Sequence, residues 1–210
     1  MSHIHDLAFN LNMTVGVPGF AESKIADKFD EYANNLYEYC KAHLEEILSL
    51  NNDEGYHVGM AFSHIVDKTP EPVSGDLFKE DDTRLKLSLY CAVICLWRAV
   101  QQGTMQSMIA THTLIQLIDK YRLRYFEPIF MMLTGLSLRQ IIEEKTPDEV
   151  KKMTEKIYKI TKYYLIQITR MQDAFKDANM KACELGEKFM NTIHDEMCNS
   201  LRGYITLGLL

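Results

Sequence analysis

The fold is decided by residues 84–102, which read RLKLSLYCAVICLWRAVQQ. Apolar residues fall on almost every side of a helix drawn through this stretch, which predicts a central helix that is buried all round. Asp82 or Thr83 can cap the start of this helix, and Gly103 stands at its end. Residues 85–91 also alternate between apolar and polar, so a strand at the start of the stretch is the competing interpretation.

Two further segments alternate with period two, which is typical of strands with one buried face. In residues 7–17 the apolar residues stand at every second position, so we expect a strand with Phe9 and Leu11 in the core. Residues 56–66 alternate in the same way and predict a second strand. The two strands either pair in parallel or belong to a small sheet as non-adjacent members.

The remaining long segments predict helices, because apolar residues recur at three- and four-residue steps. These segments run over about residues 21–50 and 104–125, and from Thr146 to about Leu185 with further helix to Ser200. We therefore expect an α+β fold dominated by helix. Long amphipathic helices would surround the central apolar helix, beside a small two- or three-stranded sheet.

The composition describes an ordinary globular protein, because 47 % of the 210 residues are apolar and 25 % are charged. No linker rich in proline, glycine and serine divides the chain, so residues 1–210 are expected to form a single globular domain. Residues 67–83 contain two prolines, a glycine and six acids, and predict an exposed acidic loop.

Several features place the protein in the cytoplasm without membrane insertion. The N-terminus lacks the basic and apolar regions of a secretory signal. The longest apolar run, Leu89–Trp97, is far shorter than the roughly 20 residues that span a membrane. The five cysteines are an odd number and indicate reduced thiols in a cytosolic core.

Charge is distributed unevenly along the chain. Residues 1–83 hold 16 acids and 5 bases, a net charge of −11, and residues 84–126 hold 1 acid and 6 bases, a net charge of +5. Such an acidic surface is either simply solvated or selects a basic or amphipathic partner segment, and it disfavours nucleic acid. The acids expected to contact this partner are Asp27, Asp30, Glu31, Glu38, Asp76, Glu80, Asp81 and Asp82.

The C-terminal segment is a second candidate for partner binding. Residues 204–210 carry five large apolar side chains and no charge, whereas chain ends are usually polar. We expect this tail to dock, either as an extra strand beside residues 7–17 or 56–66, or against a partner through Leu207, Leu209 and Leu210.

Two sets of residues have the chemistry of a metal or haem site. Cys91 and Cys95 are four residues apart, as are His194 and Cys198, and two such pairs facing each other would make a tetrahedral zinc site. His112 is a candidate axial ligand for haem in a helical pocket. Small cysteines also fill helical cores and a lone histidine is usually structural, so we expect no metal and no cofactor.

No motif names a reaction, because the chain lacks GxGxxG, GK[ST], GxSxG and HExxH patterns. In size, acidity and absence of motif it resembles the small chaperones and adaptors of bacterial secretion systems, a likeness of general character over the whole chain. The resemblance implies a non-enzymatic adaptor that binds segments of partner proteins. The alternatives are a helical sensor that binds haem or a hydrophobic small molecule, and an enzyme of unrecognised type.

Overall fold

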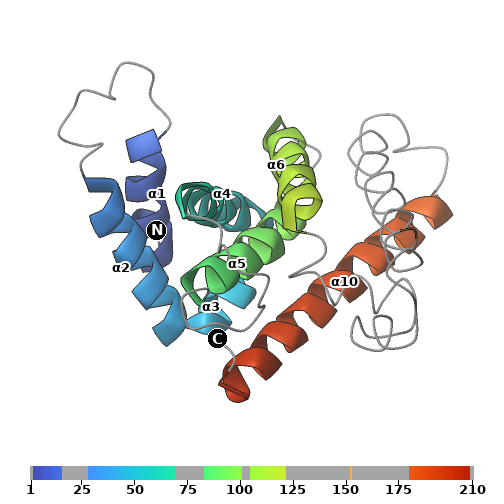
Figure 1. Cartoon of the computed structure of the whole chain (residues 1–210). Coiled ribbons are helices and arrows are strands. Elements are labelled where there is room, and N and C mark those ends of the chain that lie inside the picture. Colours follow the sequence, from blue (N-terminus) through green and yellow to red (C-terminus); the bar gives the residue numbers. More distant parts are fainter. Residues whose placement is uncertain are drawn as a thin grey trace. The chain divides into compact units, whose positions relative to one another are not determined.

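The computed structural model describes residues 2–15, 28–69, 83–100, 105–121, 152 and 180–208. The regular elements within these residues are all helices (Figure 1): α1 (His3–Val15), α2 (Phe29–Ala42), α3 (Leu44–Leu48), α4 (Asn52–Lys68), α5 (Thr83–Ala99), α6 (Met105–Tyr121) and α10 (Met180–Thr206). The helix-dominated character is therefore confirmed, and the predicted sheet is wrong for the part of the chain that the structure describes.

The chain divides into two compact units, Met1–Ala99 and Val100–Leu209. The first unit contains α1 to α5, and the second contains α6 and α10. The single domain expected over residues 1–210 stays a prediction. The helix predicted from Thr146 lies outside the described residues as far as residue 179, apart from the helical Lys152.

The acidic loop predicted over residues 67–83 lies mostly outside the described residues. At its start, Asp67 and Lys68 are exposed residues in the last turn of α4, and at its end Thr83 is the first residue of α5. Helix therefore occupies both ends of this predicted loop.

Residues 7–17 do not form the predicted strand, because all of them that the structure describes belong to α1. The buried side chains of α1 recur at helical spacing: Ile4, Ala8 and Leu11. The prediction was right for Leu11 and wrong for Phe9, whose side chain is 51 % exposed. The alternation misled because it placed the small Ala8 on the outer face, although in a helix this residue shares the buried stripe.

Residues 56–66 also belong to a helix, α4, and not to a second strand. Asn51 caps the N-terminus of α4, because its side-chain oxygen accepts a 2.9 Å hydrogen bond from the backbone N–H of Glu54. The buried face of α4 includes two glycines and a serine, Gly55, Gly59 and Ser63, beside larger apolar residues. These larger residues are Val58, Phe62, Ile65 and Val66. The period-two pattern assigned the small residues to the outside, whereas a helix uses them where it approaches a neighbour closely.

The single helix predicted over residues 21–50 is divided at His43, whose φ of −131° and ψ of 43° are not helical. The His43 ring packs on Tyr39, with ring centroids 4.3 Å apart, and its backbone N–H donates to the Tyr39 carbonyl oxygen. Buried residues occur on both sides of the break, so the apolar spacing of the sequence does not reveal it. Residues 21–27 lie outside the described part.

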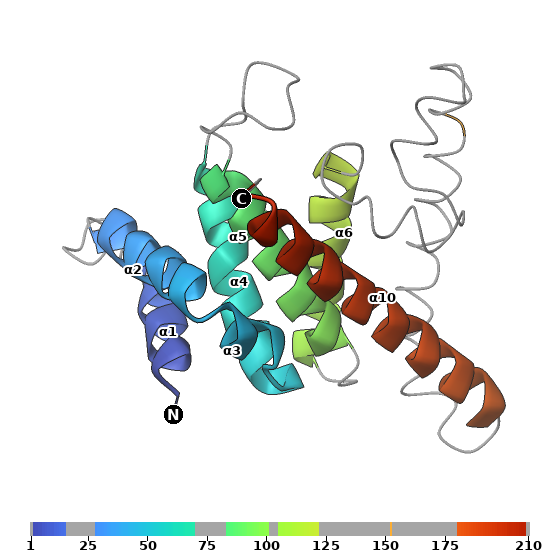
Figure 2. The same cartoon turned by 90° about the horizontal axis from the view of Figure 1, so that it is seen from below.

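The core of the first unit lies between α4 and α5, which are side by side in both views (Figures 1 and 2). Every residue of α5 from Leu85 to Trp97 is buried, so the central apolar helix is confirmed and the strand at residues 85–91 is excluded. α1 packs against α4 and α2, and α3 packs against α5. A long helix that is apolar all round is thus placed where neighbours cover it.

The two described helices of the second unit each have one buried face. α6 buries Ser107, Ala110, Thr111, Leu114 and Leu117, and it exposes Met105, Met108 and Ile109. α10 buries Ile193, His194, Met197, Cys198 and Leu201. The extra strand, one of the two ways in which residues 204–210 were expected to dock, is wrong for residues 204–206, which form the last turn of α10.

Candidate functional site

The surface of α1 to α4 carries an excess of negative charge. The described residues up to Thr69 hold nine acids and three lysines, a net charge of −6. Each lysine lies over an aromatic ring of α2: Lys28 Nζ is 5.8 Å from the Tyr32 ring centroid, Lys41 Nζ 5.3 Å from that of Tyr37, and Lys68 Nζ 3.9 Å from that of Phe29. The few positive charges of this surface are therefore held at ring faces.

Three of the acids that were predicted to bind a partner lie on α2. Asp30, Glu31 and Glu38 are all exposed, and Glu31 and Glu38 are seven residues apart, on one face of the helix. Glu38 Oε2 is 3.7 Å from Lys41 Nζ, an exposed ion pair of small energetic value. The acids of α2 thus form a stripe about two helical turns long.

Helix α1, which packs against the acidic helix α2, carries exposed apolar side chains. Phe9 is 51 % exposed, Met13 38 % and Val15 40 %. Phe9 and Met13 are four residues apart, so they occupy neighbouring positions on one face of α1. Because α1 packs against α2, the helix with exposed apolar side chains lies beside the acidic helix.

The other residues predicted to bind a partner are only partly described. Leu207 lies in the turn after α10 with 73 % of its surface exposed. The remaining candidates lie outside the described residues: Asp27, Asp76, Glu80, Asp81, Asp82, Leu209 and Leu210. The acidic contribution of the loop therefore stays a prediction.

The residues considered as zinc ligands are two buried pairs on two helices. Cys91 and Cys95 lie on α5, and His194 and Cys198 lie on α10. Among the residues that the structure describes, no group of three or more histidine, cysteine or acidic side chains is placed to hold a metal ion. His112, the haem candidate, lies on the exposed face of α6.

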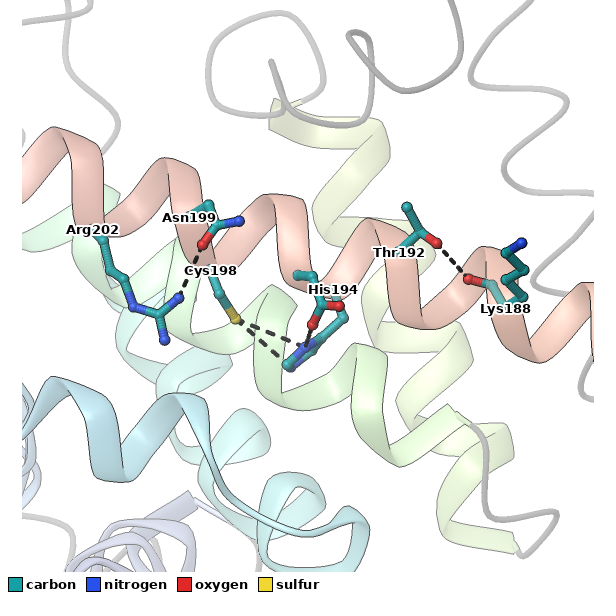
Figure 3. A network of polar contacts seen from close by, with 7 residues as sticks. Lys188, Thr192, His194, Cys198, Asn199 and Arg202 are labelled. Carbon is teal, nitrogen blue, oxygen red and sulfur yellow. Dashed lines mark hydrogen bonds and ion pairs between the residues drawn. The ribbon is translucent and has the colours of Figure 1, made fainter.

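His194 and Cys198 point toward one another on α10 (Figure 3). Cys198 Sγ is 3.8 Å from His194 Nδ1 and 3.9 Å from Nε2. A general base accepts a thiol proton along the axis of one ring nitrogen, and a sulfur equidistant from both lies off either axis. Asp195 Oδ1 is 3.6 Å from the same Nδ1, so it does not orient the opposite nitrogen. The pair fits a packing role in the buried face of α10.

Sequence reasoning missed a cluster of histidine and tyrosine rings at the N-terminal end of α1. The His3 ring contacts Tyr39 at 5.0 Å between centroids, and the His5 ring contacts His57 at 5.2 Å. Asn12 Nδ2 adds a 2.9 Å hydrogen bond to the His57 carbonyl oxygen. These contacts fasten α1 to α2 and α4. His5 and His57 are too far apart in the sequence for any local spacing to reveal the contact.

The chain matches no protein-family model, and no curated protein or solved structure matches it. None of the helices in the described ranges is long and apolar enough to span a membrane.

Proposed function

We propose that the protein is a non-enzymatic cytosolic adaptor that binds a basic, amphipathic segment of a partner protein. The binding surface is formed by the acidic stripe of α2 and the exposed apolar side chains of α1. The partner segment would place its lysines or arginines along Glu31 and Glu38 and its apolar side chains against Phe9 and Met13. The segment belongs to a larger complex in which the adaptor takes part.

The observation that carries this proposal is the charge of the surface. The described residues up to Thr69 include nine acids and only three lysines, and these lysines lie over aromatic rings of α2. Negative potential of this kind attracts a basic segment and repels an acidic one, and it acts mainly on the association rate.

The apolar side chains explain why the partner should be amphipathic as well as basic. A half-exposed phenylalanine loses its remaining contact with water when an apolar side chain covers it, which favours binding by roughly 25 cal/mol per Å² of apolar surface. Phe9 and Met13 are the largest such side chains on α1. Charge would thus steer the segment, and α1 would hold it.

The test uses the full chain and a fluorescein-labelled peptide about five helical turns long, with leucine on one face and lysine on the other. We expect saturable binding by fluorescence anisotropy, with an association rate that falls several-fold between about 0.05 and 0.3 M salt. A peptide of the same composition in scrambled order, which has no apolar face, should bind more weakly. Equal binding of the two peptides, or binding indifferent to salt, would contradict the proposal.

Variants locate the site. Glu31→Gln with Glu38→Gln should slow association, and Phe9→Ser should speed dissociation. The matched control is Glu187→Gln with Asp195→Asn, which removes two exposed charges from α10 and should leave binding unchanged. If both pairs weaken binding equally, only net charge matters and α2 is not the site.

The sensor and the enzyme of unrecognised type stay predictions from the sequence, and no feature of the described residues favours either. His112 is exposed on α6, and Cys198 Sγ lies at nearly equal distances from the two ring nitrogens of His194.

A further inference from the structure

Two cysteines of the first unit meet in its interior. Cys40 of α2 and Cys91 of α5 are 51 residues apart in the sequence, and their sulfur atoms are 3.3 Å apart. Both side chains are 0 % exposed.

We propose that Cys40 and Cys91 are an oxidation site, at which peroxide closes a disulfide that ties α2 to α5. The sulfurs need to approach by roughly 1.3 Å to reach the bond length of a disulfide, a shift within reach of side-chain rotation.

The chemistry balances with hydrogen peroxide as the oxidant. The Cys40 thiolate attacks one peroxide oxygen, the O–O bond breaks, and water leaves after protonation, which gives a sulfenic acid. The Cys91 thiolate then attacks the sulfenic sulfur, the S–S bond forms, the S–O bond breaks, and a second water leaves. Two thiols lose two electrons and two protons, and one peroxide is reduced to two waters.

The position of Cys40 explains how a buried thiol meets the oxidant. Cys40 stands in the last turn of α2, which ends at Ala42, and the following His43 is not helical. Helix ends open more readily than helix centres, so peroxide reaches Cys40 when this turn frays. Cys91 lies in the middle of α5 and resolves the sulfenic acid when the turn closes again.

The disulfide would close a covalent ring that contains α3 and α4. Such a ring removes conformations mainly from the unfolded chain, so the oxidised protein should melt on the order of 10 °C higher than the reduced one. Because cytosolic disulfides are usually transient, dithiothreitol should reverse both the bond and the rise in Tm.

Peptide mapping of the oxidised full chain tests the pairing directly. Trypsin cleaves after Lys28, Lys41, Lys86 and Arg98, so the bond would join peptide 29–41 to peptide 87–98. The second peptide also contains Cys95, and fragment ions between positions 91 and 95 distinguish the two sulfurs. Intact mass should show the loss of two hydrogen atoms per chain.

Variants provide an independent measurement. Cys40→Ser and Cys91→Ser should each abolish both the cross-link and the rise in Tm, whereas Cys95→Ser, one turn further along α5, and Cys198→Ser on α10 should retain both. Mapping of the unaltered chain needs no variant to fold. A cross-link to Cys95, oxidation that stops at sulfinic acid without a cross-link, or a lower Tm after oxidation would each overturn the proposal.

Discussion

Gly59 of α4 and Leu96 of α5 are in such close contact that a Cβ atom added at Gly59 would lie 2.8 Å from Leu96 Cγ. The same Cβ would lie 3.0 Å from the Leu96 backbone nitrogen, and Leu96 is 0 % exposed, so neither group has room to move away. One turn earlier, a Cβ at Gly55 would lie 2.9 Å from the Cys95 carbonyl oxygen. The two glycines therefore set how closely α4 approaches α5.

Substitution of Gly59 tests this contact. Gly59→Ala should lower the free energy of unfolding by about 1–3 kcal/mol, because the methyl group overpacks the interface. The matched control is Gly203→Ala in α10, where an added Cβ meets nothing within 4 Å. There alanine should be neutral or should raise stability by up to about 1 kcal/mol. Urea unfolding measures both, and equal effects at the two glycines would contradict the close approach.

The cap of α4 gives a second prediction. Asn51→Ala removes the acceptor of the Glu54 N–H and should cost about 1 kcal/mol of stability, whereas Asn51→Asp keeps an acceptor and should cost little. Chemical denaturation followed by circular dichroism compares the three proteins. A loss of equal size in both variants would mean that the amide acts in some way other than capping.

His64 of α4 predicts a dependence of stability on pH. Burial lowers the pKa of His64, Asp67 opposes this shift, and Lys68 adds to it. The unfolded chain therefore binds a proton at higher pH than the folded one, so the free energy of unfolding should fall as pH drops below about 6.5, by at most about 1.4 kcal/mol per pH unit.

The measurement is urea unfolding at several pH values between roughly 5 and 8. His64→Gln should remove this part of the slope. Asp67→Asn should carry the loss of stability to lower pH, because the charge that raises the pKa of His64 is gone. A pH profile that is the same in His64→Gln as in the unaltered chain would show that other groups produce the slope.

A carboxylate introduced on the buried face of α1 should lower stability far more than one introduced on the exposed face. Leu11 is 0 % exposed and Phe9 is 51 % exposed. Leu11→Asp should cost several kcal/mol, because it replaces a core side chain by a carboxylate, whereas Phe9→Asp should change stability by less than about 1 kcal/mol. Thermal melting ranks the two variants. A larger loss of stability for Phe9→Asp would contradict the helix and support the strand that the alternation of residues 7–17 predicts.

Apolar residues on almost every side predicted α5 as a buried helix. Periodicity predicted α6 and the part of α10 up to Ser200, because apolar residues recur there at three- and four-residue steps. It failed for α1 and α4 because it treated small residues as outward. Ala8, Gly59 and Ser63 carry little apolar surface, yet they are buried where helices lie close together.

The exposure of the acids of α2 could be predicted from the sequence, since charged side chains on a helix face solvent unless they are paired. The contacts between distant residues were not. Cys40 meets Cys91, and His5 meets His57, across more than 40 residues of chain, and such pairs depend on how the helices pack. The spacing of residues along the sequence does not predict how the helices pack against each other.

The close approach of α4 to α5 also bears on the recognition of distant relatives. Random substitution soon erases overall similarity, but a position with no room for a methyl group accepts few replacements. Homologous chains should therefore retain glycine at the positions of Gly55 and Gly59, four residues apart and ahead of a long apolar helix. That spacing offers a signature for tracing the ancestry of this fold when the rest of the sequence has diverged.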